Sequence, residues 1–279
     1  MSGFSAQWLA LREPVDLRSR DAALAAEVAR RFSRHPHVNV IDLGCGTGAN
    51  LRVLAPLLGA EQSWQLVDYD PLLLAAASER LAAWADTARA AAEGLELTKA
   101  GRHIKVTFRN ADMARDLPNI LAPPVELITA SALFDLFSPA AIERLAGIVA
   151  HHRAVLYTVL TYDGRIGSEP ASASDQAVIA AFNAHQRRDK GFGPAAGPTA
   201  PAVLAECFSR AGYEVREGQS PWRLGAADGG LMAALVTGVL DAVRESGELA
   251  ESVIEEWSAR GHRTAVVGHI DTLALPRGS

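Results

Sequence analysis

Apolar positions along the chain alternate between helical spacing and short continuous runs. Residues 20–33 carry apolar side chains at helical spacing, with Asp21 placed to cap the N-terminus, and this pattern predicts a helix. Residues 37–44 form a short β-branched run that ends at a glycine, which predicts a buried strand. The same criteria predict further strands over 63–68, 103–109, 125–129 and 153–161, and helices over 71–92 and 139–150.

The second half of the chain is less regular. Residues 189–198 are rich in glycine and proline, which predicts irregular backbone. Helices are expected over 172–188, 200–211, 226–245 and 248–259, and strands over 213–217 and 264–275. We expect one domain over residues 1–279, with an N-terminal helical segment (1–35), a lid-like helical insertion (165–200) and extra helices between the last two strands (225–260).

Strands that alternate with helices predict an α/β fold. The βαβ units of such a fold build a doubly wound, mostly parallel sheet with helices on both faces. Ligands bind these sheets at the carboxyl ends of the strands, near the point where the strand order reverses. The residues that follow each predicted strand are therefore the candidates for a binding site.

A glycine-rich loop follows the first predicted strand. Gly44, Gly46 and Gly48 let the backbone turn tightly and approach a ligand where a Cβ would collide. With Ala49, the loop also satisfies the Gly-x-Gly-x-x-Gly/Ala pattern of dinucleotide sites, and Asp68 lies about 20 residues on, where those sites place an acid for the ribose. The glycines alone therefore fit more than one nucleotide cofactor.

Asp42 distinguishes between these cofactors. It places a carboxylate at the end of the strand, two residues before Gly44. A carboxylate repels a pyrophosphate and attracts a ligand that carries an ammonium and a sulfonium group. The position of Asp42 therefore favours a cofactor that carries cationic groups over a dinucleotide.

At these residues the sequence resembles the class I S-adenosylmethionine-dependent methyltransferases, whose first motif is an acid, an apolar residue and then Gly-x-Gly-x-Gly. Residues 66–71 (Leu-Val-Asp-Tyr-Asp-Pro) look like the end of that family's second strand, and residues 110–113 (Asn-Ala-Asp-Met) like the segment after its third strand. The resemblance implies S-adenosylmethionine as the cofactor. It also implies a seven-stranded Rossmann-like sheet whose last strand is antiparallel.

The resemblance further implies roles for individual residues. Asp68 would hold the ribose hydroxyls, and Asp112 would accept a hydrogen bond from the adenine amino group. Asp42, Asp68 and Asp112 could each instead be only a loop, turn or capping residue. The other implied cofactor contacts are Gly44, Cys45, Gly46 and Gly48 around the methionine portion, Tyr69 and Met113 against the adenine, and Ser131 and Leu133 as the inner wall, with Asn50 completing the set.

The acceptor side has fewer signals. Methyl transfer from a sulfonium is an in-line displacement, so alignment in a dry pocket supplies most of the catalysis, and a base is needed only when the acceptor loses a proton. His185 is the first candidate for that base, and the alternative is a solvated polar helix. Asp135 and Tyr162, just beyond the fourth and fifth strands, are each a candidate substrate contact or a local hydrogen-bonding residue. Arg18 or Arg20 could reach the cofactor carboxylate.

Composition limits the expected partners. A formal net charge of -5 leaves no basic surplus for a phosphate backbone, so nucleic acid is not expected. Cys45 and Cys207 alone build neither a disulfide framework nor a four-cysteine metal site, and the paired histidines lack further ligands at useful spacing, so no metal is expected. The N-terminus has no signal-peptide pattern and no uninterrupted apolar run approaches membrane-spanning length, which predicts a cytoplasmic protein without a membrane partner.

Two motifs that some members of this family carry, and that this sequence lacks, indicate the class of methyl acceptor. Residues 130–135 read Ala-Ser-Ala-Leu-Phe-Asp, not the Asn-Pro-Pro-Tyr of amide and nucleobase N-methylating members, and the chain has no Pro-Cys pair of the cytosine-C5 kind. Both differences favour a small organic methyl acceptor. An NAD(P)-dependent oxidoreductase that uses the same loop, and a regulatory protein that binds the cofactor without transfer, remain alternatives. The pattern indicates neither the methylated element nor the oligomeric state.

Overall fold

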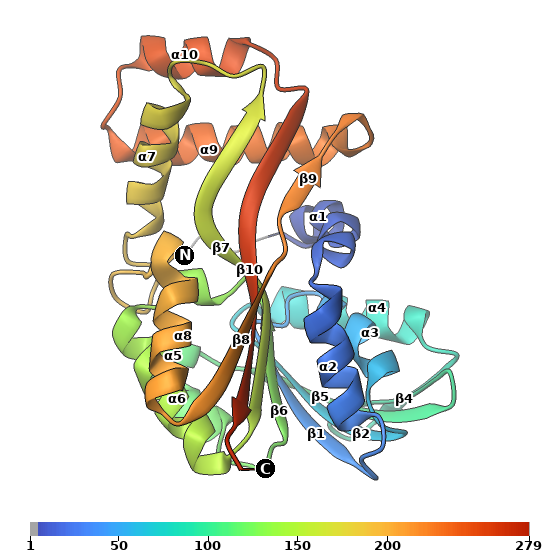
Figure 1. The fold of residues 1–279 in the computed structure, drawn as a ribbon. Coiled ribbons are helices and arrows are strands. Elements are labelled where there is room, and N and C mark those ends of the chain that lie inside the picture. Colours follow the sequence, from blue (N-terminus) through green and yellow to red (C-terminus); the bar gives the residue numbers. More distant parts are fainter. Residues whose placement is uncertain (1–4, 279) are drawn as a thin grey trace.

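A twisted sheet forms the centre of the computed structural model, which describes residues 5–278 (Figure 1). Its parallel middle has the order β5 (Arg102–Asn110), β2 (Glu61–Asp68), β1 (Val38–Leu43), β6 (Leu127–Ser131) and β7 (Val155–Glu169). Next to β7 lies the antiparallel strand β10 (Thr264–Pro276), followed by β8 (Tyr213–Gln219). This seven-stranded core, with its last strand antiparallel, confirms the predicted α/β fold class.

The complete sheet is larger than predicted, because ten strands pair within the described residues. The hairpin of β3 (Thr87–Ala91) and β4 (Gly94–Lys99) extends the sheet beyond β5, and β9 (Trp222–Leu224) pairs with β10. The helix predicted over 71–92 is therefore wrong beyond Trp84, where α4 (Pro71–Trp84) ends. Alanine favours a helix locally, but pairing of the hairpin with β5 overrides that preference.

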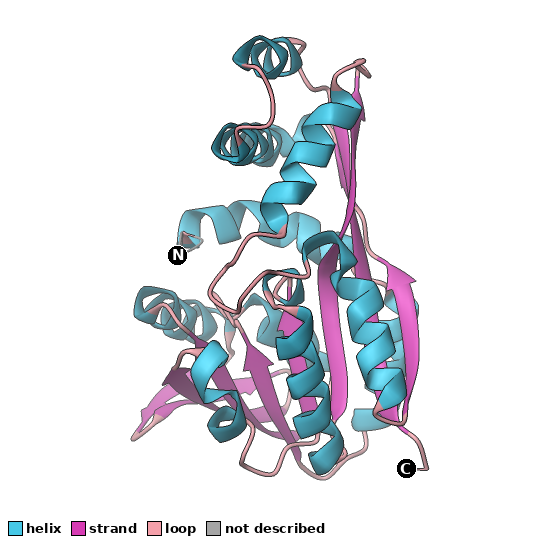
Figure 2. Ribbon diagram, turned by 90° about the vertical axis from the view of Figure 1, so that its left-hand side faces the viewer, coloured by secondary structure: helices cyan, strands magenta, loops and turns pink. Residues whose placement is uncertain are grey.

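Helices cover both faces of the sheet (Figures 1 and 2). One face packs against α2 (Ala22–Phe32), α3 (Ala49–Leu54) and α4, and its core includes Phe32 and Trp64. The other face packs against α5 (Met113–Ile120), α6 (Pro139–His152) and α8 (Ala200–Arg210), around Phe134 and Phe208. Within residues 5–278 there are also four short 3-10 helices: η1 (Ala55–Leu57), η2 (Phe134–Leu136), η3 (Gly197–Thr199) and η4 (Ala226–Asp228).

Strands β7 and β10 extend past the rest of the sheet into a second layer of helices (Figure 1). The fifth strand, expected over 153–161, continues to Glu169 because it pairs antiparallel with β10 along that whole length. Helices α7 (Asp175–Gln186), α9 (Gly229–Ser246) and α10 (Glu251–Ala259) pack together there around Val178, Val243 and Trp257. We call this part the upper lobe.

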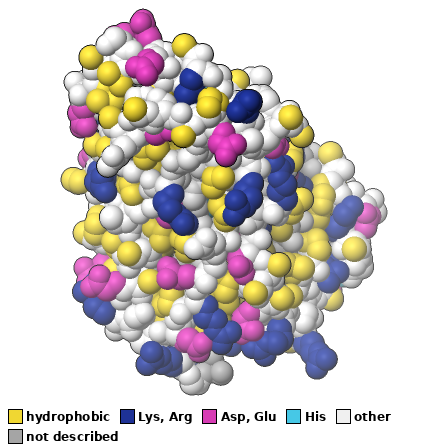
Figure 3. All heavy atoms as spheres, turned by 45° about the horizontal axis from the view of Figure 1, so that its top comes forward, with side chains coloured by type: hydrophobic (Ala, Val, Ile, Leu, Met, Phe, Trp, Pro, Cys, Tyr) yellow, Lys and Arg dark blue, Asp and Glu magenta, His cyan; other side chains and the backbone are white. Residues whose placement is uncertain are grey.

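Helix α9 includes an apolar stretch that the sequence analysis did not single out. Ala226–Ser246 has the length and apolar composition to cross a membrane, and 33% of its apolar window is buried. It contacts α1 (Ala6–Ser19), α7 and α10, which bury that third of the window within the molecule. On the face seen in Figure 3, basic and acidic side chains are interspersed with apolar ones.

Candidate functional site

The glycine loop joins β1 to α3 through three left-handed residues. Gly44, Gly46 and Gly48 have φ values of 63°, 53° and 73°, a region that side chains with a Cβ rarely adopt. A Cβ on Gly44 would lie 2.9 Å from Leu133 Cδ1, and one on Gly46 would lie 2.9 Å from Leu9 Cδ1. The loop therefore needs glycine for its backbone shape and for the close approach of these leucines.

Asp42 lies beneath this loop with no exposed surface. Its Oδ1 accepts a hydrogen bond of 2.9 Å from Asn50 Nδ2, which also donates to Thr129, while Arg20 donates to Asn50 Oδ1 at 2.8 Å. Burial raises the pKa of Asp42 to about 7, and its Oδ2 has no hydrogen-bond partner among residues 5–278. A cationic ligand group would compensate this isolated carboxylate oxygen.

Asp68, at the end of β2, supports the same loop. Its carboxylate accepts hydrogen bonds from the backbone N–H of Gly46 at 2.8 Å and of Asp70 at 3.0 Å. Burial raises its pKa, whereas these backbone donors lower it. The neighbouring side chain of Tyr69 is 53% exposed, so it lies at the rim of the site.

Asp112 and Met113 follow β5, the next strand of the sheet. Asp112 caps α5 by accepting a hydrogen bond from the N–H of Ala114 at 3.0 Å, and Met113 is buried. The register pairs Asp68 with Asn110, whose amide donates to the Tyr69 carbonyl at 2.7 Å. The topology thus brings all three predicted acids to one edge of the sheet, where the second oxygen of Asp112 lies 3.5 Å from Arg115 Nε.

Helix α1 covers the glycine loop, a feature that the sequence analysis missed. A cavity of about 50 Å³ lies between them, lined from the sheet side by Gly44, Cys45, Gly46, Thr47, Ala49, Asn50 and Ser131, and from α1 by Leu9, Arg12, Glu13 and Asp16. Glu13 forms ion pairs with Arg52 and, at 3.6 Å, with Arg80. Pro14 interrupts the helical pattern of this segment, so the pattern did not predict α1. The spacing of Arg12 and Asp16 at i and i+4, which form an ion pair, was a signal that could have indicated the helix.

The candidate cofactor-carboxylate ligands Arg18 and Arg20 differ in their surroundings. Arg18 pairs with Asp228 at 2.7 Å, outside the loop, whereas Arg20 contacts Asn50 within the network of Asp42.

Two of the three acceptor-side candidates lie near one another. Asp135 belongs to η2, and its Oδ1 is buried without a hydrogen-bond partner in the described part of the chain. Burial raises the pKa of Asp135 to about 6, while the charges of Arg12 and Lys190 lower it. Tyr162 donates a hydrogen bond of 2.8 Å to Asn183 Oδ1, and burial, then the charges of Asp163 and Asp135, raise the pKa of its phenol.

His185 makes a different contact. It lies on α7 with its Nε2 2.9 Å from Glu245 Oε2 of α9, so its imidazole joins two helices of the upper lobe. Its assignment as a base stays a prediction.

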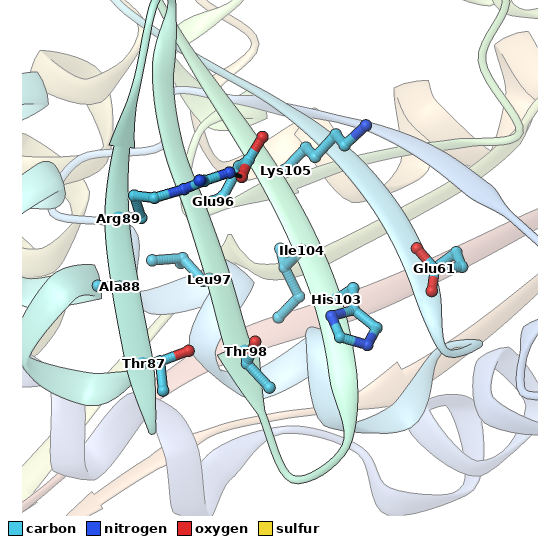
Figure 4. A pocket seen from close by; sticks show the side chains of 10 residues that line it. All are labelled: Glu61, Thr87, Ala88, Arg89, Glu96, Leu97, Thr98, His103, Ile104 and Lys105. Carbon is cyan, nitrogen blue, oxygen red and sulfur yellow. Dashed lines mark hydrogen bonds and ion pairs between the residues drawn. The ribbon is translucent and has the colours of Figure 1, made fainter.

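A larger hollow, of about 530 Å³, lies elsewhere, across strands β3, β4 and β5 (Figure 4). Figure 4 shows Arg89, Glu96 and Lys105 along one end of it and His103 and Thr98 along the other. None of the predicted site residues lines it. Within residues 5–278, no group of three or more histidine, cysteine or acidic side chains could hold a metal ion.

Comparison with solved structures relates this geometry to known proteins. A cyclopropane-fatty-acyl-phospholipid synthase-like protein of Lactobacillus casei is 16% identical, with 98% of this chain and 95% of that chain covered and a TM-score of 0.55. A candidate methyltransferase of Bacillus halodurans is 10% identical over 91% of this chain and 100% of that chain, with a TM-score of 0.52. The YcgJ protein of Bacillus subtilis is 12% identical over 93% and 100%, with a TM-score of 0.51.

The chain has the Rossmann-like methyltransferase fold. No protein-family model matches it. At these identities the likeness concerns the fold, and the chemistry must be argued from the site itself.

Proposed function

We propose that this protein binds S-adenosylmethionine and transfers its methyl group to a small organic acceptor. The observation that carries the proposal is the meeting of Asp42, Asp68 and Asp112 beside the glycine loop, at the carboxyl ends of β1, β2 and β5. In this type of sheet, ligands bind at that edge. The order of the strands, which is that of the methyltransferase fold, supports the same conclusion.

The residues of this edge fit the proposed cofactor. Asp42 keeps one buried carboxylate oxygen without a partner, which suits a site for a cationic amino acid portion. Residues 44–48 form a cradle that Cβ atoms would fill, Asp68 would hold the ribose, and Asp112 with Met113 would hold the adenine. Tyr69 would cover the rim, and Ser131 and Leu133 would form the inner wall.

Binding requires α1 to move. The cavity of about 50 Å³ between α1 and the glycine loop is too small for the methionine portion of the cofactor, so that portion would enter when Leu9, Arg12 and Glu13 withdraw from the loop. When α1 returns, it excludes water from the reacting atoms. The helix therefore acts as a cover for the cofactor site.

When bound, the cofactor supplies an electrophilic methyl group on a sulfonium. The contribution of this chain is to align the acceptor with that methyl and to take the proton of the acceptor where one is lost. Asp135 is suited to the second task, because its free Oδ1 is buried and its pKa of about 6 lies near physiological pH. Tyr162, close by on β7, would contact the acceptor.

Isotope transfer tests the proposal. Purified protein, S-adenosylmethionine labelled in its methyl group and small-molecule extract of the host should yield a labelled low-molecular-mass product, identified by its mass. Asp68→Ala should abolish labelling, whereas the exposed control Glu143→Gln should preserve it. If S-adenosylhomocysteine binds but no compound is ever labelled, the protein is a cofactor-binding regulator and the proposal of transfer is wrong. A cytoplasmic location and the small size of the acceptor remain predictions.

A further inference from the structure

Four aromatic rings pack one against the next where α1 meets β9, at interplanar angles of 54–64°, and we call them the aromatic wall. Trp8 of α1 lies 6.4 Å from Trp222 of β9, Trp222 lies 5.2 Å from His269 of β10, and His269 lies 6.3 Å from Tyr162 of β7, measured between ring centroids. Trp222, His269 and Tyr162 are each less than 10% exposed. Segments far apart in the sequence thus present planar side chains to one another.

The aromatic wall adjoins the cofactor cavity through Arg12. This residue lines the cavity beside Gly44 and Ser131, and its guanidinium lies over the Trp222 ring, 5.0 Å from the centroid. Asp16 fixes the arrangement, because it accepts 2.8 Å hydrogen bonds from both Arg12 Nε and Trp222 Nε1. A molecule against the wall would therefore lie next to the methionine end of the proposed cofactor site.

Three buried polar atoms without hydrogen-bond partners in the described residues belong to this region. They are His269 Nδ1, Trp8 Nε1 and Asp135 Oδ1, and His269 itself is 5% exposed, with the backbone of Val267 as a weak neighbour of its imidazole. A buried polar atom left unpaired costs about 1–3 kcal/mol, so such atoms in one region indicate a ligand that satisfies them. Burial and the charge of Arg12 lower the pKa of His269 to about 3, so its imidazole is neutral at physiological pH.

We propose that the aromatic wall binds the methyl acceptor, that the acceptor is a planar aromatic or heteroaromatic molecule bearing a hydroxyl or N–H group, and that His269 hydrogen-bonds to it. Planar π systems pack well on aromatic rings, and the Arg12 guanidinium, which lies over Trp222, would face the acceptor ring from α1. This inference rests on the proposed methyl transfer. His269 is thus an acceptor-binding residue that the sequence did not reveal.

The groups of this region are sufficient for a balanced methyl transfer. A lone pair of the acceptor oxygen or nitrogen forms the new bond to the methyl carbon, and the methyl carbon–sulfur bond breaks with its electron pair left on sulfur. The proton of the acceptor passes to the carboxylate of Asp135. S-adenosylhomocysteine and the methylated acceptor leave, and the carboxyl of Asp135 returns its proton to water.

Calorimetry with matched probes tests the inference. With the protein saturated by S-adenosylhomocysteine, we expect 2-naphthol and 8-hydroxyquinoline to bind at least about tenfold more tightly than the saturated analogue decahydro-2-naphthol or the chain alcohol dodecanol. His269→Phe keeps a ring but removes Nδ1 and should weaken binding of the aromatic probes about tenfold. His269→Asn places a polar atom near the position of Nδ1 and should restore binding to within about threefold of the wild type.

A second histidine provides the control. His262 packs against Trp257 in the upper lobe at 4.3 Å, away from the wall, and His262→Phe should leave probe binding unchanged. If the aromatic wall served only to pack the interior of the protein, His269→Phe would preserve or raise Tm and would leave the affinity for the aromatic probes unchanged. That result would overturn the inference. Equal binding of saturated and aromatic probes, or no binding of any aromatic probe to the S-adenosylhomocysteine complex, would overturn it as well. Failure of S-adenosylhomocysteine itself to bind would instead refute the proposed function.

Discussion

Asp42 is held at the end of β1 without contact to solvent, and only one of its carboxylate oxygens is hydrogen-bonded in the described residues. Burying a carboxylate in this way disfavours its charged form, and the pKa of about 7 expresses that cost. A hydrophobic or amide side chain would serve folding better at this position. The charge is therefore best explained by a ligand that compensates it.

Asp42→Asn should separate stability from binding. Because burial raises the pKa of Asp42 in the folded state above its ordinary 3.8, protonation stabilises the fold fully below that value, and this contribution is lost as the pH rises through about 7. The neutral amide has no charged form to bury, so the variant keeps this stability at pH 8. Its Tm at pH 8 should therefore exceed that of the wild type, by about 2–4 °C for each 1 kcal/mol gained, while at pH 3.5 the two Tm values should differ little. Thermal denaturation at both values measures this. S-adenosylhomocysteine affinity should fall, and a lower Tm at pH 8 would contradict our account of the buried charge.

The pH dependence of methyl transfer should report on Asp135. The carboxyl acts as a base only when ionised, so with its pKa at about 6, kcat/KM should fall about tenfold per pH unit below that value and level off above it. Asp135→Asn should lower kcat/KM by about 100-fold or more and remove this acidic limb. The pH profile is measured with the product identified by isotope transfer. An unchanged limb in the variant would assign the titration to another group.

The sequence predicted the residues that act through local structure and missed those that meet only in three dimensions. Gly44, Gly46 and Gly48 are recognisable because strand, loop and helix follow one another directly. Three distant segments supply Arg12, Trp222 and His269. These residues meet only because β10 pairs with β9 and α1 packs against β9. No spacing within the chain encodes that arrangement.

At the scale of elements, α1 links the chemistry of the site to motion. It is attached to the cofactor loop through Glu13 with Arg52 and Arg80, and to β9 through Asp16 with Trp222. The ion pairs of Glu13 are partly exposed and can break without loss of the core, whereas Val15 of the same helix is buried in that core. A cover held in this way can open and close while the sheet stays intact.

Glu13→Gln should loosen this cover. Loss of the ion pairs with Arg52 and Arg80 should raise the association and dissociation rates of S-adenosylhomocysteine together, by about three- to tenfold, because opening of α1 becomes more frequent. The free energy of unfolding should change by less than about 1 kcal/mol, as is usual for partly exposed pairs. Stopped-flow tryptophan fluorescence provides the rates, with the exposed Glu79→Gln on α4 as the control. Rates equal to those of the wild type would show that α1 does not limit entry.

Two elements show where local patterns fail. Residues 87–91 are exposed and rich in alanine, and only their pairing with β4 makes them a strand. Strand β7 runs past Tyr162 to Glu169 because β10 offers a partner along its whole length. Both outcomes depend on contacts between distant parts of the chain, which periodicity does not report.

On the scale of the whole molecule, the order of the seven core strands determines where the acids meet. Because β1, β2 and β5 are parallel neighbours, their carboxyl ends share one edge, and the predicted site could be derived from topology alone. The upper lobe was only outlined by the sequence, since it is built on the extension of β7 and β10. The cofactor side is thus general to the fold, whereas the acceptor side is particular to this chain.

Calorimetric titration of the purified protein with S-adenosylhomocysteine, NAD and NADP tests the central claim most directly. Our account predicts one site for S-adenosylhomocysteine, no measurable binding of either dinucleotide, and loss of the site in Asp68→Ala, because the Asp68 carboxylate supports Gly46 and is proposed to hold the ribose. The exposed control Glu79→Gln should bind as the wild type does. Binding of NAD or NADP without binding of S-adenosylhomocysteine would contradict the account and identify the glycine loop as a dinucleotide site.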